Sequence, residues 1–183
     1  MDLICFSHFK WDFVFQKPQN LLAKFSSVYR IFYIEEPLFN SSEEKFSLIP
    51  AGEGIWVVKL YLKGDKNDSD DNIRQRKLLK TLFVIMNIHR YILWFYTPMA
   101  LPLSDDMSAD LIIYDCLDEN ANFKIAPEGY TRLEESLISK SDLIFNRGKS
   151  LYDEKKLCLL ANVIINIKVI LNEKYNGNQN IIS

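Results

Sequence analysis

The 183-residue chain is poor in glycine and cysteine, with six and three copies respectively. No two cysteines form a C-x-x-C pair, which excludes a disulfide scaffold and a cysteine-based zinc site of standard spacing. No G-x-G-x-x-G pattern follows the first apolar segment, so the usual dinucleotide fingerprint is missing. The longest apolar stretch, residues 81–103, is interrupted by His89, Arg90, Pro98 and Pro102. A membrane-spanning helix needs about 20 predominantly apolar residues in a row, so none is expected.

Neither sign of charge is in large excess, because the chain has 22 Lys and Arg residues and 24 Asp and Glu residues. A nucleic-acid binder is normally basic on one face, so we expect no nucleic-acid partner. Asp2 stands where a secretory signal needs basic residues, and the apolar run after it is too short. Hydrophobic residues make up 48% of the chain, which excludes disorder as its main description. We expect a cytoplasmic protein, with peripheral contact at the inner face of the membrane left open.

Short apolar runs alternate with segments of helical pattern along the chain. Ile73, Leu78, Leu82, Ile85 and Ile88 recur near a 3.6-residue period and predict one face of a helix. Regular alternation of strands and helices predicts an α/β fold, a doubly wound parallel sheet of the Rossmann-like kind. The expected strands are residues 3–6, 30–34, 55–62, 92–96, 111–114 and 143–145, and the expected helices are residues 18–29, 71–91 and 130–140.

Polar residues gather where the predicted strands end. In open parallel sheets, ligands bind in the crevice beyond the carboxyl ends of the strands. Any single strand must end in something polar, but five ends together predict a polar cleft along one edge. The residues concerned are Ser7, His8, Glu35, Glu36, Thr97, Asp115, Asp118, Glu119, Asn146, Arg147 and Lys149.

Two short motifs resemble ligand sites and fail the test of their context. Gly148-Lys149-Ser150 lacks the glycine that a P-loop requires five positions earlier, where Leu143 stands. Arg147 and Lys149 still precede an expected helix, so they are either an anion site or a solvated basic turn. Asp68-Ser69-Asp70 matches a D-x-D metal motif, but it lies in a hydrophilic loop without rigid support. No metal is therefore expected.

The few histidines and cysteines offer one candidate. His8 ends the first predicted strand and would face the crevice, whereas His89 is expected late in a helix as a structural residue. Cys5 and Cys116 lie in or beside strands, and no histidine is placed locally to activate either thiol. Both cysteines are predicted to be small buried residues rather than nucleophiles.

Several blocks of the sequence resemble a known family in order and spacing. They are residues 6–21, which contain a W-D-x-x-x-Q-x-P-Q-x-L block, together with residues 34–37, 93–99, 114–119 (Y-D-C-x-D-E), 141–145 and 150–152. Across residues 2–156 the chain resembles the amino-terminal domain of bacterial glycosyltransferases of the GT-B fold. The resemblance is to the retaining, family four-like group that includes teichuronic-acid and other cell-surface polysaccharide enzymes.

This resemblance implies a site and a chemistry. Such enzymes have two Rossmann-like domains across a cleft, the first receiving the acceptor and the second holding the nucleotide-sugar. A sugar is transferred to a hydroxyl, and the leaving diphosphate is stabilised by basic groups and helix ends rather than by a metal. The residues implied to line the acceptor side of the cleft are His8, Trp11, Asp12, Gln16, Thr97, Asp115, Asp118 and Glu119. The catalytic residues stay unassigned.

The sequence departs from the family near its end. We expect residues 1–156 to form the acceptor-side domain and residues 157–183 to be an atypical tail, apolar and then polar. The nucleotide-sugar domain is expected to be absent, so no cofactor is expected on this chain and a donor only with the missing domain. The expected partners are a carbohydrate acceptor and either a second polypeptide carrying the donor domain or a second copy. The alternative is a non-catalytic sugar- or partner-binding module that retains the fold.

Overall fold

The computed structural model describes residues 1–12, 17–66, 70–116 and 129–146. All of them belong to one structural unit, Met1–Asn146. The predicted domain boundary after residue 156 lies outside the described residues.

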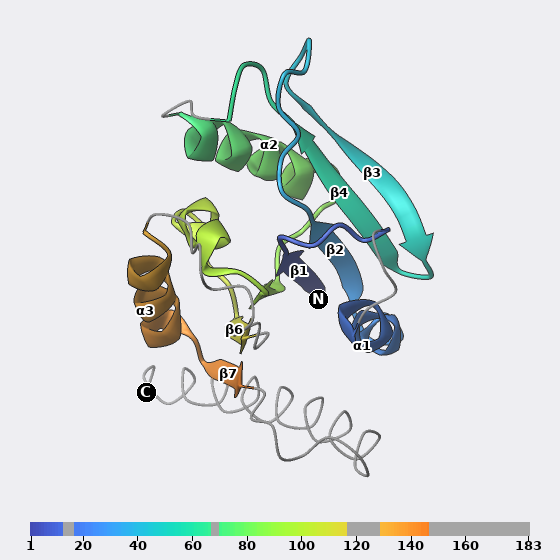
Figure 1. The fold of residues 1–183 in the computed structure, drawn as a ribbon. Coiled ribbons are helices and arrows are strands. Elements are labelled where there is room, and N and C mark those ends of the chain that lie inside the picture. Colours follow the sequence, from blue (N-terminus) through green and yellow to red (C-terminus); the bar gives the residue numbers. More distant parts are fainter. Residues whose placement is uncertain (13–16, 67–69, 117–128, 147–183) are drawn as a thin grey trace, which may run out of the picture. The chain divides into compact units, whose positions relative to one another are not determined.

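Seven strands form one sheet in the order β3-β4-β2-β1-β5-β6-β7 (Figure 1). Every neighbouring pair is parallel except β3 and β4, which are antiparallel. With β3 set aside, the strands run third, second, first, fourth, fifth and sixth across the sheet, which is the Rossmann order. The predicted doubly wound α/β fold is confirmed. The strands are β1 Asp2–Phe6, β2 Arg30–Ile34, β3 Lys45–Gly52, β4 Ile55–Tyr61, β5 Tyr91–Phe95, β6 Leu111–Cys116 and β7 Leu143–Asn146.

Helices cover both faces of the sheet. Successive side chains of a strand point to opposite faces, so Ile4 and Phe6 of β1 join the core under α2 (Asp71–Ile85), the 3-10 helix η1 (Pro98–Ser104) and α3 (Tyr130–Lys140). Helix α1 (Lys17–Phe25) lies on the opposite face (Figure 1), where its Phe25 ring meets Trp94 of β5 with ring centroids 5.5 Å apart. Two buried layers result, one on each side of the sheet.

Strand β3 was not predicted, and it makes the sheet mixed. It is an edge strand whose exposure follows no clean alternation, and it contains Pro50 next to a register shift at Gly52. Proline cannot donate to the ladder and is found at sheet edges or bulges. The strand was not predicted because its sequence is neither a continuous apolar run nor a regular alternation of apolar and polar residues.

Helix α2 is shorter than predicted. It ends at Ile85, and Asn87 then takes a left-handed conformation with φ of 54°. Asparagine is among the few residues that tolerate this region, so the chain turns there and begins β5 at Tyr91. His89, expected late in the helix, instead lies exposed in the connection.

The predicted apolar face of α2 is also partly wrong. The buried residues of the helix are Gln75, Leu79 and Leu82. Ile73 and Ile85, expected in the core, are 57% and 63% exposed. The face of α2 that packs on the core therefore carries Leu79 and Leu82.

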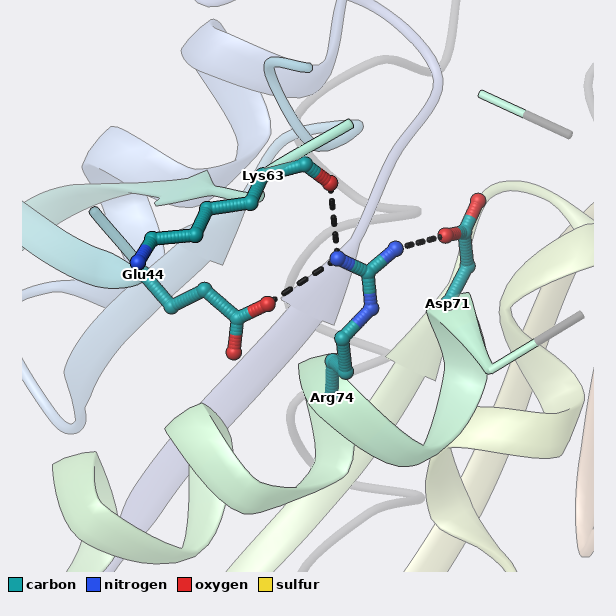
Figure 2. Close-up of polar contacts among 4 residues, drawn as sticks. All are labelled: Glu44, Lys63, Asp71 and Arg74. Atoms are coloured by element: carbon teal, nitrogen blue, oxygen red, sulfur yellow. Dashed lines mark hydrogen bonds and ion pairs between the residues drawn. The ribbon is translucent and has the colours of Figure 1, made fainter. Parts of the chain in front are cut away.

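Arg74 ties α2 to the β3–β4 hairpin, as Figure 2 shows. Its Nη1 donates to Oε1 of Glu44 at 2.9 Å and to the carbonyl of Lys63 at 2.7 Å. Its Nη2 donates to Oδ1 of Asp71 in the same helix. Glu44 precedes β3 and Lys63 follows β4, so one guanidinium holds the open end of the hairpin against the first turn of α2.

Candidate functional site

The carboxyl ends of the central strands meet at one edge of the sheet. Phe6 of β1 pairs with Phe95 of β5, which pairs with Tyr114 of β6. The expectation that His8, Thr97 and Asp115 belong to the same edge is therefore confirmed. The chain leaves β1 and β5 toward opposite sides of the sheet order, which makes the gap between them the switch point where Rossmann-like folds bind ligands.

The segment after β1 is anchored to β2. Ser7 is buried, and its Oγ accepts a hydrogen bond from the Phe9 N–H at 3.0 Å. The phenol of Tyr33 donates to the same Oγ at 2.7 Å and lies 3.1 Å from the Phe9 carbonyl oxygen. Burial raises the pKa of Tyr33, although the hydrogen bond with Ser7 acts in the opposite direction. The phenol therefore stays protonated and holds the loop as it leaves the sheet.

Trp11 is held on both sides of its backbone. Its N–H donates to Oε1 of Glu35 at 2.7 Å, and its carbonyl accepts from Nε2 of Gln19 at 2.8 Å. Its indole meets the Tyr33 ring edge-on, with centroids 4.9 Å apart. The side chain remains partly exposed. Contacts from Tyr33 of β2, from Glu35 just after it and from Gln19 of α1 thus fix a partly exposed tryptophan beside the carboxyl end of β2.

Glu35 is a buried acidic residue at this edge. It follows β2, and its Oε2 lies 3.9 Å from Nζ of Lys59 on β4. Because a buried carboxylate needs a partner, the Trp11 N–H and the Lys59 ammonium together explain how this one is tolerated. The carboxylate is used to hold the loop.

Thr97 follows β5 and caps η1. Its Oγ1 accepts a hydrogen bond from the Met99 N–H at 3.3 Å, and Pro98 occupies the first turn. The residue is buried. The structure therefore gives its hydroxyl a capping role, and its use toward an acceptor stays a prediction.

Asp115 lies inside β6 rather than after it, and it is 3% exposed. It is on the α1 face of the sheet, near Cys5 of β1. Burial raises the pKa of the Cys5 thiol, and the Asp115 carboxylate raises it further. Cys5 is buried as predicted, and Cys116 is only partly so.

The remaining predicted residues fall into two groups. His8 and Asp12 are exposed on the segment that carries Trp11, and the His8 ring lies 3.8 Å from the Phe9 ring. The others lie outside the described residues: Gln16, Asp118, Glu119, Arg147 and Lys149. Within the described ranges, no group of three or more His, Cys, Asp or Glu side chains could hold a metal ion.

Sequence reasoning missed Tyr33 and Gln19. Tyr33 looks like one more residue of a buried strand, and Gln19 like a polar residue in the first turn of a helix. The Pro18-Gln19 pair next to a tryptophan-bearing loop was the available signal for the second. No local pattern signals the first, because its partner is 26 residues away.

No family model matches the chain, and no curated protein matches it. Among solved structures it is similar to trehalose-6-phosphate synthase from E. coli bound with UDP-2-fluoro glucose, with a TM-score of 0.51 and 13% identity over 81% of this chain and 40% of that one. An apo structure of OtsA has a TM-score of 0.48 and 13% identity, over 79% of this chain and 40% of that one. The third structure is a UDP-forming alpha,alpha-trehalose-phosphate synthase from Burkholderia xenovorans in complex with glucose-6-phosphate. Its TM-score is 0.47 and its identity 14%, over 81% of this chain and 41% of that one.

The first of these likenesses concerns the fold. A mixed α/β unit with a seven-stranded, mostly parallel sheet matches a Rossmann-like half of a GT-B glycosyltransferase. The chain spans about 40% of the length of the E. coli structure. In the described part of the chain, no helix is both long and apolar enough to cross a bilayer.

Proposed function

We propose that this chain is the acceptor-binding part of a glycosyltransferase that moves a sugar from a nucleotide-sugar to a glycan acceptor. The observation that carries the proposal is the segment after β1, where Trp11 is fixed beside the carboxyl end of β2. Exposed His8 and Asp12 flank it with groups able to bond sugar hydroxyls. The shared GT-B fold supports this reading.

The narrower identity is part of the same proposal. The sequence blocks around Trp11 and Tyr114 favour a family four-like enzyme of cell-surface polysaccharide synthesis. A nucleotide-sugar would then be held chiefly by a second Rossmann-like domain, carried by another polypeptide or a further part of the protein. The acceptor oxygen would form the new glycosidic bond at the anomeric carbon as the bond from that carbon to the nucleoside diphosphate breaks, and the acceptor's proton would pass to the departing phosphate.

The test is a binding experiment on the 183-residue chain. Isotope-labelled protein is titrated with a panel of mono- and oligosaccharides, and separately with UDP- and GDP-sugars. We expect saccharides to shift the backbone signals of His8, Trp11 and Asp12 while His89 stays unchanged. Saturable shifts confined to residues 63–66, or no saccharide binding, would contradict the proposal. Micromolar affinity for a nucleotide-sugar, together with product formation by this chain alone, would contradict the proposal that a second domain holds the donor.

A further inference from the structure

Trp11 is more tightly fixed than a surface-loop residue needs to be. Loops are usually the mobile and variable parts of a domain, yet this residue has its N–H, its carbonyl and its ring all held by distant residues. Glu35 lies 24 positions away and Gln19 eight, and the Tyr33 ring meets the indole from β2. Two contacts therefore hold the backbone of Trp11 and a third holds its partly exposed indole.

The other two tryptophans show what a structural role looks like in this fold. Trp94 is 1% exposed and packed between Phe25 and Phe145. Trp56 stacks on Phe32, with ring centroids 5.5 Å apart, and packs against the core under α2. Each of these two tryptophans lies within a strand. Trp11 instead lies on the segment that follows β1.

A fixed indole face suits one class of ligand in particular. A pyranose ring has an apolar face of C–H groups and a rim of hydroxyls, so it needs a flat apolar surface beside polar side chains. Binding to a preformed surface avoids the entropy cost of ordering that surface at the moment of binding. Around Trp11, the exposed side chains of His8, Lys10 and Asp12 supply donors and acceptors for the rim.

We propose that Trp11 is a preorganised stacking platform for a pyranose ring of the acceptor, held in place by Glu35, Gln19 and Tyr33. The inference rests on the proposed function and adds to it the contact that recognises the sugar. The Tyr33 ring lies at 70° to the indole, with centroids 4.9 Å apart, so the two rings meet edge to face and are not stacked. Glu35, Gln19 and Tyr33 are positioning residues in this scheme, since they act through Trp11.

The experiment follows the three indole N–H signals of the full chain during titration with the saccharide that the wild-type chain binds best. Trp11→Phe and Trp56→Phe variants assign the signals. We expect the Trp11 signal to shift saturably, while those of Trp56 and Trp94 stay within error. Trp11→Tyr keeps a ring face and should bind within about threefold of wild type, whereas Trp11→Leu should bind about fivefold to tenfold more weakly.

The outcomes separate the two proposals. If the wild-type chain binds no saccharide, the proposed function fails and the platform fails with it. If saccharide binds and Trp11→Leu retains wild-type affinity with an unchanged melting temperature, the platform is overturned while the function stands. If Trp11→Tyr and Trp11→Leu weaken binding equally, dependence on a ring face is refuted. A loss in Trp11→Leu that Trp11→Tyr restores supports the proposal.

Discussion

Asp2 and Arg30 face each other at the first position of the β1–β2 register and form a two-bonded ion pair. Nε of Arg30 lies 2.7 Å from Oδ1 of Asp2, and Nη2 lies 2.8 Å from Oδ2. The Asp2 side chain is 4% exposed and that of Arg30 is 44%. The hydrogen bond with Asp2 raises the pKa of Arg30. The buried Asp2 carboxylate therefore depends on the ion pair more than the Arg30 guanidinium does, because water reaches the guanidinium.

We predict that Arg30→Ala costs more stability than Asp2→Asn. The first change leaves a buried carboxylate without its partner, at a cost of about 1–3 kcal/mol or more. It also removes the guanidinium from above the Phe32 ring, 5.8 Å from its centroid. The second change leaves a guanidinium that water already reaches and an amide oxygen that still accepts. Urea unfolding at neutral pH measures both, and a larger loss in Asp2→Asn would contradict the argument.

The Arg74 contact should control the hairpin of β3 and β4. Arg74→Lys replaces a planar fork with a single point donor, which cannot reach Glu44, Lys63 and Asp71 together. We expect a loss of about 1–3 kcal/mol in Arg74→Met and most of that loss in Arg74→Lys. Hydrogen exchange of the β3 amides should accelerate in both.

Arg76→Met is the matched control for this change. Arg76 lies in the same helix, and its ion pair with Asp105 is longer, at 3.5 Å. It should cost well under 1 kcal/mol, as partly exposed ion pairs usually do. Equal effects of Arg74→Met and Arg76→Met on β3 exchange would show that the hairpin does not depend on Arg74.

Alkaline pH should destabilise the fold through its buried phenols. Burial raises the pKa of Tyr33 and of Tyr114, and the hydrogen bond with Glu134 raises that of Tyr114 further. Above the ordinary tyrosine pKa of 10.0 the unfolded chain loses protons that the folded chain keeps. The contribution of these two phenols to stability is then constant below this pH and falls above it, by about 1.4 kcal/mol per pH unit for each phenol.

Tyr114→Phe tests the alkaline effect. It removes one titrating group, so the free energy of unfolding should fall less steeply between about pH 10 and about pH 11 than in wild type. Its stability at pH 7 will be lower, because Glu134 loses a hydrogen bond of 2.7 Å. The informative quantity is therefore the slope with pH and not the absolute value. An unchanged slope would show that this phenol ionises as freely in the folded chain as in the unfolded one.

The Cys5 thiol should be inert in the native protein. It is buried, and both burial and the Asp115 carboxylate raise its pKa, so the reactive thiolate is disfavoured. Cys5→Ser should therefore leave native-state labelling by a thiol reagent unchanged and remove one label in denaturant. Loss of a label from the native Cys5→Ser chain would contradict this. Cys116→Ser is the comparison, because that thiol is partly exposed.

The sequence predicted the strands and helices that have one strong local signal. The predicted strand at residues 30–34 and the predicted helix at residues 130–140 match β2 and α3 in both bounds. Strand β3 escaped prediction because its stability comes from pairing with β4 at an edge. The buried face of α2 was only partly predicted, because packing against the rest of the fold decides which residues of the helix are covered.

Only part of the candidate site could be predicted from the sequence. The position of His8 and Thr97 at one edge follows from strand direction, which the alternation of elements predicts. The contacts that fix Trp11 do not, because Glu35 and Tyr33 reach it through space from the neighbouring strand. A single sequence contains both residues but not their pairing.

The tie between Glu35 and Trp11 leads to the last prediction. Glu35→Leu keeps a similar volume but cannot accept the Trp11 N–H bond of 2.7 Å, and it leaves Lys59 without its carboxylate partner. An unpaired N–H in a partly buried place costs about 1–3 kcal/mol, so the segment should open locally. Exchange of the Trp11 amide should accelerate about tenfold or more, and saccharide affinity should fall with it. Glu35→Gln keeps an acceptor oxygen and loses only the charge facing Lys59, so it should retain most of the protection of the Trp11 amide.

Glu36→Gln is the matched control at the exposed neighbouring position, and it should behave as wild type. Wild-type exchange of the Trp11 amide in Glu35→Leu would show that Gln19 and Tyr33 suffice to hold the segment. Accelerated exchange with unchanged saccharide affinity would show that the fixed position of Trp11 is not what the ligand requires.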